Sequence, residues 1–197
     1  KLDKKKNIII GKNELDITKC RKLKPYSQTE YIGRILWTFA SPFFKYSPRP
    51  FFAWRRLLLR LFGAKIGTEA HVDPTAKIYL PWKLILGDQS SIGENAIIYN
   101  LGLITIGHKA TISQRVHLCA GTHNYNDLSM QLLRQPIEIG SQAWICADAF
   151  IGPNVSIGES SVIGAASVVV KNIPPMQVFA GNPAVFVKKR LFFDNSQ

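Results

Sequence analysis

The residues best suited to acid–base or nucleophilic chemistry lie in one polar segment near the middle of the chain. Cys119 and His123 stand four residues apart, and Asn124 and Asp127 follow closely. An imidazole titrates near neutral pH and therefore suits proton transfer, while a thiol beside a histidine suits nucleophilic attack. The three cysteines are scattered without CxxC spacing, so we expect a reduced, cytoplasmic protein.

The element that must position this segment is a six-residue repeat. An Ile, Leu or Val recurs at fifteen anchor positions, and a small or β-branched residue stands four places after most of them. A period of six fits neither a helix nor one long strand. It fits short strands joined by tight corners, which stack into a parallel β-helix. The anchors are Ile66, Val72, Ile78, Leu86, Ile92, Ile98, Ile106, Ile112, Leu118, Ile139, Ile145, Ile151, Ile157, Ile163 and Val169.

Three interruptions of the repeat predict where the coil projects outward. Two extra residues follow the third anchor, two follow the sixth and fifteen follow the ninth. If three repeats make one turn, all three insertions leave from the same corner and the anchors form about five coils. The residues that should line this one edge are Tyr79, Trp82, Tyr99, Asn100 and His123.

The net charge of the chain belongs to its N-terminal third. Residues 1–65 hold 16 Lys+Arg and 4 Asp+Glu, whereas residues 66–197 hold 9 of each. Within this basic arm we expect helices over Tyr31–Phe44 and Phe51–Phe62, and a short strand or anchor at Ile8–Ile10. We expect the helices to cap the first coil, because an open solenoid end exposes strand edges. Contact with an anionic bilayer is a second role for the arm.

Several classes of protein and segment are not expected. The sequence contains no run of 18 apolar residues, so we expect no membrane span. The apolar run after Lys1–Lys6 is too short for a signal peptide. No recognised nucleic-acid motif accompanies the charge. The predicted organisation is a basic arm over residues 1–65, a β-helix over 66–173 with a protruding loop at 122–136, and a tail over 174–197.

Five segments, added to the repeats, make the chain resemble the hexapeptide-repeat acyltransferases. The resemblance is strongest to O-acetyltransferases of the colanic-acid type and to maltose and galactoside O-acetyltransferases. It implies a left-handed β-helix, a homotrimer with active sites between subunits, and transfer of an acetyl group from acetyl-CoA to a sugar hydroxyl of a polysaccharide or lipopolysaccharide precursor. The segments are Cys119–Tyr125, Ala143–Ile145, Ile163–Ser167, Val170–Pro175 and Ala180–Ala184.

The resemblance also implies roles for individual residues. His123 matches the general base, and Asn100 matches a residue that positions the acceptor, beside Tyr99 and Trp82 at the predicted edge. No metal is required for this reaction. The chain departs from the family at Val185, where some relatives carry a second arginine. The residues implied for CoA are Trp144 and Ala147 in the pantetheine channel, Ala165, Val170 and Lys171 at a CoA-contacting turn, and Lys188 in the tail.

Three other functions compete with this one. Zinc-dependent carbonic anhydrases share the coil, but this chain has only four histidines and His117 and His123 suit that spacing poorly. A Cys119 nucleophile is an alternative, although direct transfer needs no covalent intermediate. A non-catalytic β-helix scaffold is the third, and it would have no use for the His123 loop. A sugar carried on a lipid would place the enzyme at the inner face of the membrane.

Overall fold

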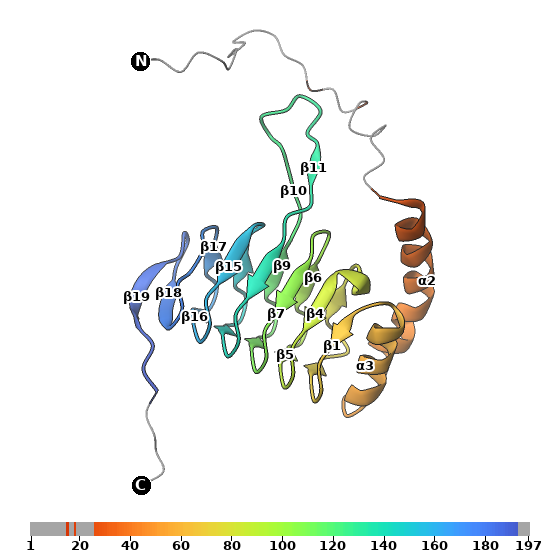
Figure 1. Ribbon diagram of the computed structural model, residues 1–197, viewed down its shortest axis with the longest axis horizontal. Coiled ribbons are helices and arrows are strands. Elements are labelled where there is room, and N and C mark those ends of the chain that lie inside the picture. Colours follow the sequence, from red (N-terminus) through yellow and green to blue (C-terminus); the bar gives the residue numbers. More distant parts are fainter. Residues whose placement is uncertain (1–14, 16–17, 19–25, 193–197) are drawn as a thin grey trace.

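The computed structural model describes Leu15, Thr18 and residues 26–192. Figure 1 shows a column of stacked coils with two helices across one end and one long loop standing out from its side. The segment Ile8–Ile10, expected as a strand or anchor, lies outside the described residues. The prediction of a mainly β fold with an N-terminal helical arm is therefore confirmed.

Three parallel sheets form the sides of the column. The first sheet contains β1 (Lys65–Ile66), β4 (Leu84–Leu86), β7 (Ile104–Ile106), β12 (Ile137–Ile139) and β15 (Val155–Ile157). The second sheet contains β2 (His71–Val72), β5 (Ser91–Ile92), β8 (Thr111–Ile112), β13 (Trp144–Ile145), β16 (Val162–Ile163), β18 (Gln177–Ala180) and the antiparallel β19 (Val185–Lys189). The third sheet contains β3 (Lys77–Ile78), β6 (Ile97–Tyr99), β9 (His117–Cys119), β14 (Phe150–Ile151) and β17 (Val168–Val169).

The anchors stack in register along each sheet and form the core. Ile78 pairs with Ile98, and Ile98 pairs with Leu118. All fifteen anchors are buried, and so are the small residues four places after them. Each coil therefore places one large and one small side chain inward per strand, and burial of this apolar surface against the next coil is what holds five turns together.

The tight corners depend on backbone conformations that the pattern of residue types does not reveal. Ten residues standing three places after an anchor have φ between 52° and 61°, although none is glycine. At the first edge, between the first and second sheets, glycine follows all five anchors. A Cβ on Gly107 would lie 2.5 Å from the backbone nitrogen of Ser141 in the next coil. Only glycine allows the coils to approach so closely there.

The three insertions leave from one edge, between the third and first sheets, as predicted. We call this the third edge. The first insertion forms a 3₁₀ turn at Pro81–Lys83, and the longest contains the antiparallel pair β10 (Thr122–His123) and β11 (Leu132–Leu133). This pair is the stem of the protruding loop in Figure 1.

Helices α2 (Gln28–Lys45) and α3 (Phe52–Leu61) cover the open end of the first coil. Ser27 begins α2 with a capping box in which its hydroxyl accepts from the Glu30 amide and the Glu30 carboxylate accepts from the Ser27 amide. The buried face of α2 presents Trp37 and Phe44, and that of α3 presents Leu58 and Leu59. Both predicted helices are confirmed.

The first coil has no coil before it, and hydrogen bonds from these helices take the place of those that a preceding coil would donate. In the second coil, the anchor carbonyls of Leu86, Ile92 and Ile98 accept from backbone amides of the first coil. In the first coil, the equivalent carbonyls accept from side chains instead. Ile66 accepts from Arg60, Val72 from Arg55 and Ile78 from Trp37, with donor–acceptor distances of 2.6–3.0 Å.

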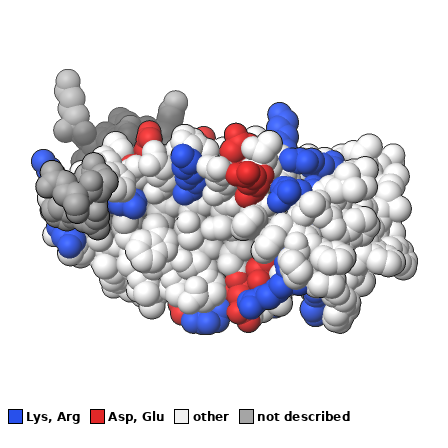
Figure 2. All heavy atoms as spheres, turned by 90° about the horizontal axis from the view of Figure 1, so that it is seen from below, with Lys and Arg blue, Asp and Glu red and all other residues white. Residues whose placement is uncertain are grey.

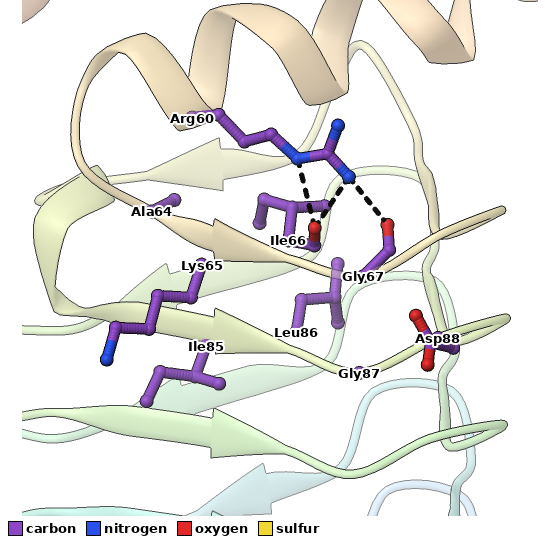
Figure 3. A pocket seen from close by; sticks show the side chains of 9 residues that line it. All are labelled: Arg60, Ala64, Lys65, Ile66, Gly67, Ile85, Leu86, Gly87 and Asp88. Atoms are coloured by element: carbon purple, nitrogen blue, oxygen red, sulfur yellow. Dashed lines mark hydrogen bonds between the residues drawn. The ribbon is translucent and has the colours of Figure 1, made fainter.

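The arginines of α3 are thus the end cap of the β-helix. Figure 3 shows the guanidinium group of Arg60 over the carbonyls of Ile66 and Gly67, at the mouth of a hollow that extends to Asp88. Exposed carbonyls need donors, and a guanidinium group supplies five N–H groups and accepts nothing. Capping, the first role expected for the arm, is confirmed.

Within residues 26–192, no helix is long and apolar enough to cross a membrane.

Candidate active site

His123 lies on β10 at the stem of the loop, with its side chain exposed. Its Nδ1 lies 2.5 Å from the carbonyl oxygen of Met130. A carbonyl only accepts, so this contact holds the proton on Nδ1 and leaves Nε2 with its lone pair directed elsewhere. The partner of this ring nitrogen is therefore a backbone carbonyl.

The turn that carries Met130 is fixed by local hydrogen bonds. The Asp127 carboxylate accepts from the amide and the hydroxyl of Ser129, at 2.8 and 2.9 Å. The Met130 amide donates to the Asp127 carbonyl, and the Asn124 amide donates to Gln131 across the stem. This framework sets where the Met130 carbonyl lies and thus how the imidazole is oriented. Met130 was missed from the sequence because it acts through a backbone atom.

The base of the loop is tied to helix α2. Arg134 forms an ion pair with Glu30, with Nη2 2.8 Å from Oε1, and both side chains are mostly buried. The Arg134 guanidinium also lies over the ring of Tyr26, 4.6 Å from its centroid. Hydrogen bonding to Arg134 and to the Ser27 amide lowers the pKa of Glu30, although its burial opposes this. The carboxylate therefore stays charged, and the ion pair links the helical arm to the base of the His123 loop.

Asn100 lies at the third edge as predicted, but its side chain points inward. It is fully buried, and its oxygen accepts from the amides of Tyr79 and Leu80 while its nitrogen donates to the Leu80 carbonyl. This geometry does not present the Asn100 side chain to an acceptor, and its bonds hold the first two insertions together.

An aromatic row runs along the outside of the third sheet beside this edge. Tyr79 packs edge-on against Tyr99 at 4.8 Å between ring centroids, and His117 follows at 6.4 Å from Tyr99 and 5.3 Å from Phe150. Burial raises the pKa of Tyr99 and lowers that of His117. Among the described residues the buried Nε2 of His117 has no hydrogen-bond partner. Tyr99 is therefore well placed to line an acceptor site, whereas His117 stays neutral.

Trp82 does not join this row. Its ring lies beneath α2, where a Cβ on Gly33 would meet the Trp82 ring at 3.0 Å, and its Cβ lies against Gly63. Within the described part of the chain its buried Nε1 has no partner. Trp82 shares the edge with Tyr79 and Tyr99, but its packing is that of a helix support rather than an acceptor contact.

The residues matched to CoA lie on two different edges. Trp144 is on β13 with its Nε1 donating to Ser113, and Ala147 and Ala165 follow on the edge between the second and third sheets. Val170 and Lys171 come after β17 on the third edge. The side chains of Trp144, Ala165, Val170, Lys171 and Lys188 are exposed.

One chain therefore does not bring all the matched residues together. The third sheet separates its two flanking edges by roughly 10 Å, at about 3.3 Å per residue over three residues. Of the cations in the tail, Arg190 is occupied, because it donates to the carbonyls of Gln142 and Ser160. Lys188 and Lys189 of the tail and Lys171 on the third edge remain as exposed positive charges.

The alternatives for this site find less support. The Cys119 thiol donates to the Gly121 carbonyl at 3.3 Å, so its hydrogen is held within the stem of the loop. Among residues 26–192, no three His, Cys, Asp or Glu side chains gather as a metal site requires. The arrangement therefore favours acid–base chemistry by His123.

Comparison with known proteins identifies the family of the chain. No family model matches the chain. Over 158 residues it is 42% identical to WcaF of Escherichia coli (strain K12), an acetyltransferase assigned to colanic acid biosynthesis, covering 80% of this chain and 87% of WcaF. It is 32% identical over 138 residues to the galactoside O-acetyltransferase of the same organism, covering 68% of each.

A solved structure agrees with the fold. The galactoside acetyltransferase in complex with coenzyme A superposes with a TM-score of 0.76 at 26% identity, over 86% of this chain and 89% of that one. This likeness, with the stacked parallel sheets, confirms the left-handed parallel β-helix. The chain belongs to the hexapeptide-repeat acetyltransferases.

Proposed function

We propose that this protein transfers an acetyl group from acetyl-CoA to a sugar hydroxyl, with His123 as the general base. The observation that carries the proposal is the Nδ1 contact of His123 with the Met130 carbonyl, which leaves Nε2 able to accept a proton. The relatives support the substrate classes, because one is a galactoside O-acetyltransferase and another is assigned to colanic acid biosynthesis.

The reaction is a direct transfer. As the acceptor oxygen attacks the thioester carbonyl, Nε2 of His123 takes the hydroxyl proton; the C–S bond then breaks and the imidazolium returns the proton to the departing CoA sulfur. Base catalysis of this kind contributes about 10²–10⁴ in rate. A backbone N–H at Ala147 would stabilise the oxyanion formed during attack.

The exposed surface matches the two parts of the donor. Trp144 and Val170, 47% and 56% exposed, offer apolar contact to a pantetheine arm. Lys171 and Lys188 offer positive charge to phosphates. Ala165, on the edge between the second and third sheets, is small enough to leave room for a chain.

A homotrimer would complete this site. The matched residues occupy two edges of one chain, so a neighbouring copy that faces the third sheet would bring its own edge opposite the first chain's His123. Mixing a His123→Ala variant with an Ala147→Trp variant should restore activity if subunits share sites, and should not if each site belongs to one chain.

Release of CoA thiol tests the base assignment. Purified protein is incubated with acetyl-CoA and a panel of free, nucleotide-linked and lipid-linked sugars, and His123→Ala should lower kcat by about 10²–10⁴ with little change in KM for acetyl-CoA. His108→Ala is the matched control, because His108 is exposed on the first edge, away from the His123 loop on the third edge. Full activity in the His123 variant would refute the role of His123.

A further inference from the structure

The two capping helices carry a second apolar face that the cap does not use. On α2 its residues recur every three or four positions and so share one side of the helix. On α3 the exposed apolar residues follow the same spacing. Phe39 and Phe43 are 74% and 68% exposed. The members of this outer face are Ile32, Ile35, Leu36, Phe39, Phe43, Tyr46, Phe51, Trp54, Leu57 and Leu61.

The outer face is continuous from one helix to the other. Trp54 of α3 donates from Nε1 to the Phe43 carbonyl of α2, at 3.1 Å. Pro42, Tyr46 and Phe51 line the hollow around this contact. The core of the cap lies on another side of the helices, at Trp37, Phe44, Leu58 and Leu59. The outer face therefore contributes little to folding, although a face this apolar is costly to leave in water.

A strongly basic segment precedes the outer face in the sequence. Residues 1–25 hold nine Lys+Arg and three acids. Most cations of the helices and of the turn between them are used elsewhere: Arg55, Arg56 and Arg60 donate to carbonyls of the first coil, and Arg49 pairs with Asp73 and Glu94. Lys45 is exposed, with its Nζ 5.4 Å from the ring centroid of Tyr46 on the outer face. Figure 2 shows the helical end as a mainly white surface, with blue and red atoms where it meets the coils. The excess positive charge of residues 1–65 complements an anionic surface, whereas a second copy of this chain carries the same charge.

We propose that the outer face of α2 and α3 binds the surface of an anionic lipid bilayer. The aromatic and aliphatic side chains would enter the interface, Lys45 would contact lipid headgroups, and the net positive charge of the N-terminal third would attract the protein to an anionic surface. The helices would lie along the surface, since none in the described chain is suited to crossing it. This inference does not depend on acetyl transfer. Because the Glu30–Arg134 pair joins α2 to the base of the His123 loop, binding of the helices to a membrane would hold this loop near an acceptor carried by that membrane.

Vesicle co-sedimentation of the full chain tests this proposal. The protein should sediment with phosphatidylcholine vesicles that contain phosphatidylglycerol and much less with phosphatidylcholine alone, and added salt should weaken the binding. The double substitution Phe39→Asp and Phe43→Asp should lower the partition coefficient at least tenfold. Leu191→Asp is the matched control, because Leu191 is 69% exposed near the other end of the column.

Three results would overturn the proposal. They are wild-type protein that stays in solution with anionic vesicles, a double variant that binds them as well as the wild type, and sedimentation velocity showing that the double variant loses a self-association of the wild type. The last result would assign the outer face to a second copy. Unchanged thermal unfolding and unchanged activity on a soluble acceptor would show that the double variant is folded.

Discussion

Arg55 offers the sharpest test of how the helical arm holds the β-helix. Its side chain is fully buried, and Nε donates to the Val72 carbonyl at 2.7 Å. Its Nη atoms donate to the Ser47 hydroxyl and to the carbonyls of Pro48 and Arg49. The substitution Arg55→Met keeps much of the apolar stem but removes every donor.

The expected loss in the free energy of unfolding depends on whether each acceptor of Arg55 can bind water in the variant. The buried Val72 carbonyl is left without a donor, which costs about 1–3 kcal/mol. The Pro48 and Arg49 carbonyls are only partly buried and regain water, so each costs about 0.5–1 kcal/mol. Removal of the buried guanidinium returns some of this, because burial already lowers the pKa of Arg55 and so disfavours its charge. The net prediction is a loss of about 2–4 kcal/mol in the free energy of unfolding.

Urea unfolding followed by tryptophan fluorescence measures this loss, at one protein concentration for all variants. Arg56→Met is the control, because Arg56 makes one bond, of 3.1 Å, to the Ala70 carbonyl at the same end of the column. It should cost no more than about 1 kcal/mol. If the two variants unfold at the same urea concentration, Arg55 does not replace the missing coil and the capping account is wrong.

Two other predictions concern the coils. Gly107→Ala should lower the free energy of unfolding by about 1–3 kcal/mol, because the new Cβ would lie 2.5 Å from the Ser141 nitrogen. Gly152→Ala is the control, because its Cβ would meet nothing closer than 3.2 Å, and it should cost under about 1 kcal/mol. Equal losses in urea unfolding would contradict the close approach at the first edge. Burial lowers the pKa of His117 below 6.5, so the unfolded chain binds the extra proton and stability should fall as the pH drops below about 6.5. His117→Phe should flatten this acid side of the stability curve, and parallel curves for the variant and the wild type would exclude His117 as the cause.

The periodic part of the fold was predictable from residue types. A fixed anchor spacing determines which side chains face inward, so the stacking of Ile78, Ile98 and Leu118 followed from the sequence. The placement of the insertions on one edge followed from the same spacing. The left-handed backbone of residues such as Asp148 did not, because the residue types at these corners range from Glu to Ala.

The site was only partly predictable for a related reason. His123 could be located because the insertion length and the polar loop single it out. The Met130 carbonyl that orients it could not, since any residue type supplies a backbone oxygen. Asn100 and Trp82 were placed on the correct edge, but spacing does not determine where a side chain at a bulge points. Asn100 turns inward, and Trp82 packs against α2.

The measurement closest to the central claim is the stoichiometry of acetyl transfer. With a suitable sugar acceptor, wild-type protein should form one O-acetyl sugar for each CoA thiol released, and mass spectrometry should find no acetyl group on Cys119. His123→Ala should form both products at least a hundredfold more slowly. Thiol release without sugar ester, or ester formation that persists at the wild-type rate in the variant, would contradict direct transfer with His123 as the base.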